Sequence, residues 1–221
     1  MKRVFVFFLV TLLATGFVLA DVVGSLHDLS SGGTNTVTDA TEVCVFCHTP
    51  HQTTAAVSGG TPEPIDPLWN HTLSTATYGV YGSDTMNAIP AEIGNTDWSS
   101  GNTAVVSNLC LSCHDGSISV ASMYNPPNAG VPTVSGGGNV LGTGLLGTGP
   151  SNVGTDLTND HPINFTYPGA VAGEFQVPTN ATLFGGTVQC ASCHDPHLTT
   201  NGAFLVTTNT NSALCTDCHL K

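Results

Sequence analysis

The sequence of 221 residues predicts a fold made mostly of irregular coil, with short helices and few short strands. Two observations carry this prediction. The chain contains 25 Gly and 13 Pro, residues that interrupt regular secondary structure. The motif C-x-x-C-H occurs four times, and its spacing puts both sulfurs on one side of a helical turn. We therefore expect the helices to be short and to lie at the four motifs.

The expected elements follow in chain order. Lys2 and Arg3, an apolar run and small residues up to Ala20 predict a signal peptide over residues 1–20, and therefore export to the periplasm, the cell surface or the medium. Residues 21–221 form one domain of two halves, 21–130 and 150–221, joined by a Gly-rich loop. Within it we expect a helix around 105–113 and a short strand over 203–206. No later stretch is apolar enough to span a membrane.

The charge balance excludes some partners. Three Lys and Arg stand against fifteen Asp and Glu, for a formal net charge of −12. Binding nucleic acid requires clustered basic residues, so we expect no nucleic-acid partner. Only 8% of residues are charged while 40% are hydrophobic, which argues against a disordered chain.

All eight cysteines fall in the motifs, and each pair is followed directly by His: Cys44, Cys47 and His48; Cys110, Cys113 and His114; Cys190, Cys193 and His194; Cys215, Cys218 and His219. C-x-x-C-H is the attachment motif of c-type haem, in which both thiols bind the porphyrin and the histidine ligates iron. The motifs predict four covalently bound haem c groups, which supply the core that the coil lacks. Four-cysteine zinc sites, thioredoxin-like pairs and structural disulfides are the weaker alternatives.

Five further histidines are candidates for the second axial ligand of each iron: His27, His51, His71, His161 and His197. Four six-coordinate irons need four of them, and which one is spare stays open. His51 and His197 each end a C-H-x-P-H sequence, and at this spacing each is expected to reach a neighbouring haem. His27 lies on an N-terminal arm that could reach another subunit.

Acidic residues have two candidate roles. Asp28, Asp115 and Asp195 each flank a histidine, where they either orient the imidazole or are simply solvated. The haem propionates have almost no Lys or Arg to pair with. Polar groups of the chain, and calcium as a candidate cation, are expected to compensate their charge.

Segments 25–28, 44–51, 67–71, 109–116, 160–162 and 190–197 resemble those of small tetrahaem c-type cytochromes of the outer-surface type, some of which polymerise into extracellular nanowires. The resemblance implies a multihaem cytochrome c fold wrapped around four stacked haems, each with two histidine ligands. In the filament formers it also implies a haem ligated across the subunit contact.

The expected function is electron transfer without enzymatic chemistry, as a homopolymer that exchanges electrons with other redox proteins or extracellular acceptors. A monomeric periplasmic shuttle is one alternative. A reductase of a small oxyanion, with one five-coordinate haem, is another.

Overall fold

The computed structural model describes residues 21–50, 68–86, 88, 90, 106–127 and 130–220, so the predicted signal peptide and His51 lie outside the described residues. Its helices are short: η1 (Cys44–Phe46), α2 (Val106–His114), α3 (Cys190–Cys193), η4 (Thr210–Ser212) and α4 (Ala213–Thr216). The strands are β1 (Gly79–Val80), paired in parallel with β2 (Asp156–Leu157), and β3 (Phe165–Thr166), antiparallel to β4 (Thr187–Val188). Within the described ranges, no helix has the length and apolarity that crossing a bilayer requires. The prediction of a mostly irregular chain is confirmed.

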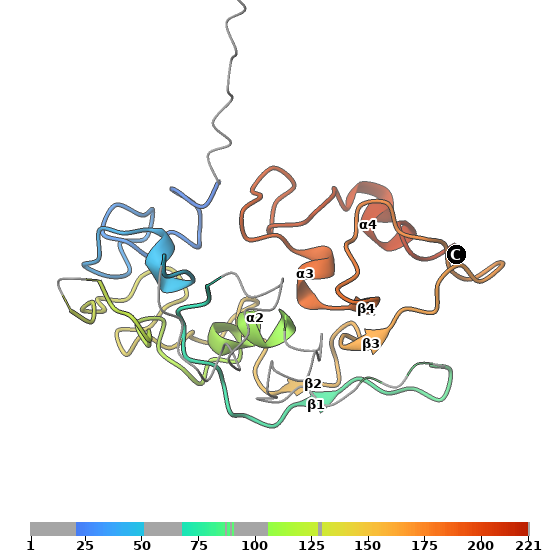
Figure 1. The fold of residues 1–221 in the computed structure, drawn as a ribbon, viewed down its shortest axis with the longest axis horizontal. Coiled ribbons are helices and arrows are strands. Elements are labelled where there is room, and N and C mark those ends of the chain that lie inside the picture. The colour runs from blue at the N-terminus through green and yellow to red at the C-terminus, as the bar shows by residue number, and fades with distance from the viewer. Residues whose placement is uncertain are drawn as a thin grey trace, which may run out of the picture.

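Helix α2 packs against α3 between the N-terminal coil and the C-terminal coil (Figure 1). Buried hydrogen bonds make this contact. The hydroxyl of Ser107 in α2 donates to Oε1 of Gln189 at 2.5 Å, and the amide of Cys190 in α3 donates to the Ser107 hydroxyl at 3.1 Å. Both Ser107 and Gln189 are fully buried, so water cannot replace these bonds without opening the contact.

Helix α2 is the longest helix among the described residues, and its sequence contains neither Gly nor Pro, which favours helix. It ends before Gly116, whose φ of +72° favours glycine and whose amide donates to the carbonyl of Cys113. Leu109 and Leu111 of the helix are buried. The helix expected around residues 105–113 is therefore present, with its first turn at Val106.

The prediction of a strand over residues 203–206 is wrong. Ala203 and Phe204 adopt left-handed φ angles of +43° and +56°, which reverse the chain, and Leu205 makes only an isolated bridge to His194. Tertiary contacts of this turn with two histidines, described below, override its β propensity. The Gly-rich segment 136–149, in contrast, is the loop that the sequence predicts, with turns and isolated bridges.

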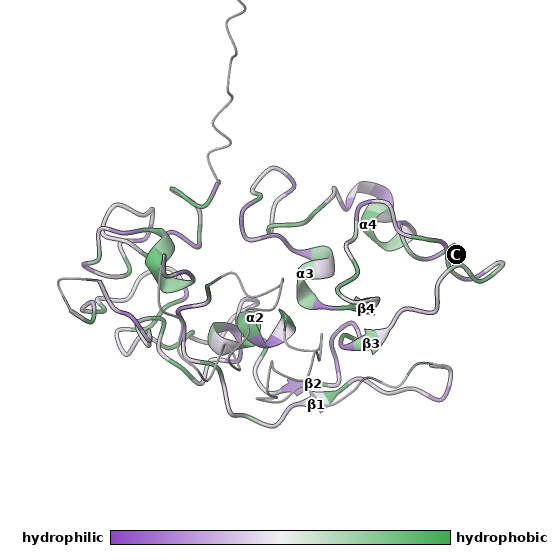
Figure 2. Ribbon diagram, in the orientation of Figure 1, coloured by the Kyte–Doolittle hydropathy of each residue, from purple (hydrophilic) through white to green (hydrophobic). Residues whose placement is uncertain are grey.

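The hydrophobic core is divided into three small clusters around α2. Two of them contain Leu109 and Leu111, and the third packs against Cys113. Among the described residues, 15 buried polar or charged side chains outnumber 13 buried hydrophobic ones. Figure 2 accordingly shows hydrophobic residues in short runs rather than in a continuous layer. Polar contacts therefore make up much of the buried part of the described chain.

Candidate haem sites

Each C-x-x-C-H motif occupies a helical turn. We name the motifs site 1 (Cys44, Cys47, His48), site 2 (Cys110, Cys113, His114), site 3 (Cys190, Cys193, His194) and site 4 (Cys215, Cys218, His219). In sites 1, 3 and 4 the histidine amide donates to the carbonyl of the first cysteine, at 2.8, 3.1 and 2.9 Å. Site 2 forms the last turn of α2. Two thiols and one imidazole therefore project from a single turn in every site.

Burial keeps three of the eight motif thiols protonated near pH 7. Burial raises the pKa of Cys47 to about 11, of Cys113 to about 12 and of Cys193 to about 11. None of the eight cysteines forms a disulfide. Zinc binds thiolates, and in the described part of the chain no three His, Cys, Asp or Glu side chains gather to hold a metal ion, calcium included. Eight unpaired thiols, two in each helical turn, are available for thioether bonds to a porphyrin.

Three motif histidines face a second imidazole. The ring centres are 6.1 Å apart for His48 and His197, 6.0 Å for His27 and His114, and 6.4 Å for His161 and His219. Two imidazole nitrogens, each about 2 Å from a shared metal ion, put their ring centres about 6 Å apart. The three separations fit two axial ligands on one iron. His197 meets the histidine of site 1 rather than that of site 3, which precedes it by three residues.

Hydrogen bonds from Nδ1 orient four of the rings. The acceptors are the Ser151 carbonyl for His114 (2.6 Å), the Pro162 carbonyl for His161 (2.8 Å), the Ala203 carbonyl for His194 (2.8 Å) and Oδ1 of Asp195 for His197 (3.0 Å). Because these acceptors carry no proton, Nδ1 must donate, and a neutral ring then keeps its lone pair on Nε2. That tautomer is the one that ligates iron through Nε2.

His27 is held within its own chain. Its ring lies 4.3 Å from that of Phe204, and the arm before it is anchored by the Asp21 amide, which donates to the His197 carbonyl at 3.2 Å. Its buried Nδ1 has no hydrogen-bond partner in the described ranges. Burial and the neighbouring His114 and His197 lower the pKa of His27 to about 4. The ring is therefore neutral near pH 7, as a metal ligand must be.

His71 has a different environment. It is almost completely buried, and its two ring nitrogens lie 3.0 Å from the carbonyls of Thr72 and Ser119. Nε2 is also 3.5 Å from Sγ of Cys113. Across the ranges that the structure describes, no second imidazole faces His71 or His194. The second ligand of site 3 remains a prediction, with His51 and His71 as candidates.

The three flanking aspartates divide into two roles. Asp195 alone among them bonds an imidazole. Asp28 and Asp115 are buried and accept hydrogen bonds from hydroxyls and backbone amides, which fix the loops beside His27 and His114. Neither of these two is solvated and neither orients a ring, so both interpretations left open by the sequence are wrong for them.

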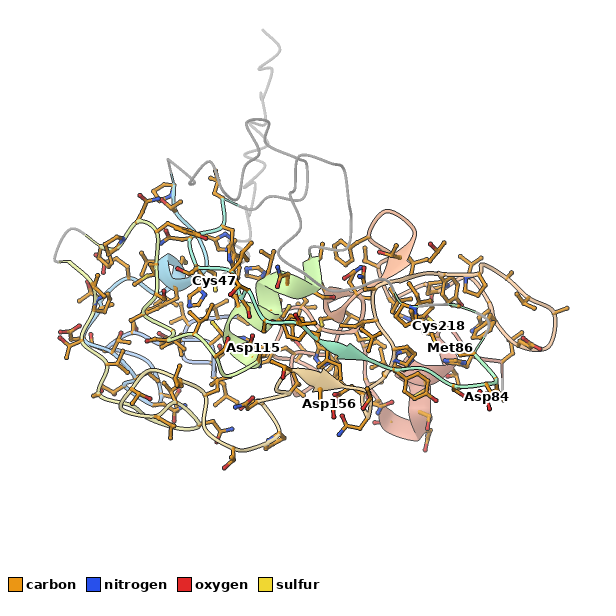
Figure 3. All side chains as sticks on the ribbon, turned by 90° about the horizontal axis from the view of Figure 1, so that it is seen from below. Cys47, Asp84, Met86, Asp115, Asp156 and Cys218 are labelled. Carbon is orange, nitrogen blue, oxygen red and sulfur yellow. The ribbon has the colours of Figure 1, made fainter. Side chains whose placement is uncertain are left out.

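Consecutive sites adjoin one another. Besides burial, a thiol of the neighbouring site raises the pKa of three thiols: Cys47 that of Cys113, Cys190 that of Cys110, and Cys218 that of Cys193. Site 2 therefore lies beside sites 1 and 3, and site 4 lies beside site 3. Figure 3 places Cys47 and Cys218 in opposite halves, as the ends of such a row.

A cavity of about 210 Å³ lies against site 3 and His161. It is lined by both cysteines and the histidine of site 3, by His161, and by the apolar Val80, Leu111, Leu157 and Val188 among others. An apolar wall with two imidazoles at its edge suits part of a porphyrin face.

Asp217, inside the fourth motif, is a residue that the sequence analysis missed. Its buried carboxylate accepts hydrogen bonds from the segment 179–181: the Thr179 amide and hydroxyl, the Asn180 amide and side chain, and the Ala181 amide. Although burial opposes the effect, these bonds hold the pKa of Asp217 far below its usual value. The sequence signal that could have indicated this role is the position of Asp217, an acidic residue between the two cysteines of a motif.

Comparison with known proteins covers the C-terminal part of the chain. Residues 184–221, which contain sites 3 and 4, match the family described as the doubled CXXCH motif. No curated protein matches the chain. The doubled motif supports a multihaem c-type cytochrome, with covalently bound haem c and electron transfer as its chemistry.

Replacing Asp217 tests its role as a loop anchor. Asp217→Ala removes the carboxylate oxygens that accept the hydrogen bonds from residues 179–181. Because buried donors lose their partner, the free energy of unfolding should fall by about 1 to 3 kcal/mol. Chemical denaturation of the mature protein, with intact mass verifying an unchanged haem content, measures this. Asp156→Ala is the control, because the exposed Asp156 carboxylate bonds only its neighbour Thr158 among the described contacts, and should leave the free energy of unfolding nearly unchanged. Equal losses in both variants would contradict an anchoring role.

Proposed function

We propose that this protein carries electrons through four haem c groups attached at sites 1 to 4. The observation that carries the proposal is the set of three imidazole pairs at ring separations of 6.0, 6.1 and 6.4 Å. When bound, haem supplies a one-electron redox centre at its iron. The chain supplies the attachment, the axial ligands and the spacing between centres.

The residues divide this work as follows. The eight motif cysteines bind covalently, and His48, His114, His194 and His219 are the first axial ligands. His197, His27 and His161 are the second ligands of sites 1, 2 and 4. At sites 1, 2 and 4, two axial ligands leave no open position for a substrate, and His51 and His71 are the candidates to fill that of site 3, which favours a carrier over a small-oxyanion reductase.

The row of adjoining sites supports transfer along the length of the molecule. Sites 2 and 3 are held together by the buried Ser107–Gln189 contact, so the two halves cannot separate without losing it. A rigid spacing keeps neighbouring redox centres at a constant distance, as fast transfer requires.

Intact mass and ligand binding test the proposal. We expect the mature protein to carry four haems, and its reduced form to bind no carbon monoxide, because every iron is saturated by histidine. A high-spin ferric fraction with carbon monoxide binding would favour the reductase. A polypeptide without haem would overturn the proposal.

We propose further that the protein works outside the cell as a polymer, delivering electrons to extracellular acceptors or other redox proteins. The predicted signal peptide and the resemblance to filament-forming cytochromes support export and assembly. The location of sites 1 and 4 in opposite halves suits contact between the end of one subunit and the start of the next. The monomeric periplasmic shuttle remains the alternative.

Electron microscopy of purified protein distinguishes these two forms. A polymer gives filaments of repeating subunits, whereas a shuttle gives only single particles and elutes as a monomer in size-exclusion chromatography.

Single substitutions test the ligand assignment. His27→Ala, His161→Ala and His197→Ala should each convert one of the four haems from low-spin to high-spin, because each removes one of two axial ligands. Of His51→Ala and His71→Ala, one should do the same at site 3, and the other should leave the spectrum unchanged. Low-spin spectra in all five variants would contradict the assignment.

A further inference from the structure

We infer that Asp195 tunes site 1: by accepting a hydrogen bond from Nδ1–H of His197, it gives this site the lowest reduction potential of the three whose imidazole pairs the structure defines. The inference rests on the proposed function, because it concerns the iron that His48 and His197 would share.

The carboxylate is held in place by two bonds to the same residue. Oδ1 of Asp195 accepts from Nδ1 of His197 at 3.0 Å and from the backbone amide of His197 at 2.9 Å. The Leu198 amide also donates to the Asp195 carbonyl at 3.0 Å, closing a turn around Pro196. The sequence Asp-Pro-His therefore builds the contact locally, and the ring cannot turn without breaking it.

The other sites have a weaker acceptor. Nδ1 of His114, His161 and His194 donates to a neutral backbone carbonyl. A carboxylate attracts the Nδ1 proton more strongly than a carbonyl does, which makes the imidazole more electron-rich and a stronger donor at Nε2. A stronger donor stabilises ferric iron relative to ferrous iron, so the potential of that site falls.

The ring planes make site 1 recognisable in a spectrum. The planes of His48 and His197 are 22° apart, whereas those of the pairs in sites 2 and 4 are 83° and 72° apart. Near-parallel imidazoles split the iron d orbitals and give low-spin ferric haem a rhombic EPR spectrum. Near-perpendicular imidazoles leave these orbitals almost degenerate and give one large-g signal. A rhombic signal that disappears in His197→Ala is therefore assigned to site 1.

The experiment is a redox titration of the mature haem-loaded protein, followed by EPR. In the wild type, the site 1 signal should persist to lower potential than the two large-g signals. In Asp195→Asn it should vanish at a higher potential, because the amide oxygen still accepts both hydrogen bonds but lacks the charge. Asp195→Glu, which restores the carboxylate, should move the potential back toward that of the wild type.

Asp160→Asn is the matched control. Asp160 is an exposed carboxylate beside His161, whose Nδ1 is bonded to Pro162 instead. The variant removes the same charge and should leave the site 1 potential unchanged. Asp195 and His197 are partly exposed, so solvent screens the direct electrostatic effect of the Asp195 charge on the iron potential. A shift in Asp195→Asn therefore acts through the hydrogen bond to His197.

Two results would overturn the inference: an unchanged site 1 potential in Asp195→Asn, or equal shifts at all sites in both variants. Either result would leave the proposed function intact, because the haem content and the low-spin spectra are recorded on the same samples. Absence of haem from those samples would instead refute the proposed function.

Discussion

The orientation of the imidazoles is the constraint on which the structure depends. An imidazole in coil is free to rotate, and a hydrogen bond from Nδ1 removes that freedom while leaving Nε2 available. The acceptor for His114 comes from a distant loop, at Ser151, whereas those for His161 and His197 lie within two residues of the ring. The loops must therefore bring an acceptor to each ring. The left-handed turn at Ala203 and Phe204 does this for His194 and also supports His27, at a cost of about 1 to 2 kcal/mol per residue.

Three of the few charged residues of the chain are buried aspartates that accept hydrogen bonds from loops. Asp28, Asp115 and Asp217 are buried, and each gathers hydroxyls or amides from a loop next to a site. In a chain with almost no Lys or Arg, such carboxylates cannot be neutralised by ion pairs, so hydrogen-bond donors compensate their burial. Loop positions that an ordinary core would hold by apolar packing are held here by carboxylates.

Two features of the fold follow from a divided core. Three small clusters cannot stabilise a chain of this length alone, and the buried contact between α2 and α3 is polar rather than apolar. Cofactors attached covalently on both sides of this contact would contribute the missing apolar surface. Helices α2 and α3 thus both carry C-x-x-C-H motifs and contact each other.

Much of the chemistry was predictable from sequence, because covalent attachment is encoded within five consecutive residues. The motifs, the coil, the helix at Val106–His114 and the Gly-rich loop required no knowledge of distant contacts. The pairing of His197 with His48 depends on loops brought together from distant parts of the chain, and so do the hydroxyls of Ser74 and Tyr78 that bond Asp115 instead of an imidazole. Local spacing limits which face a side chain can reach, but it does not specify its partner. Tertiary packing made that choice, since ring contacts and hydrogen bonds form only after the coil has folded.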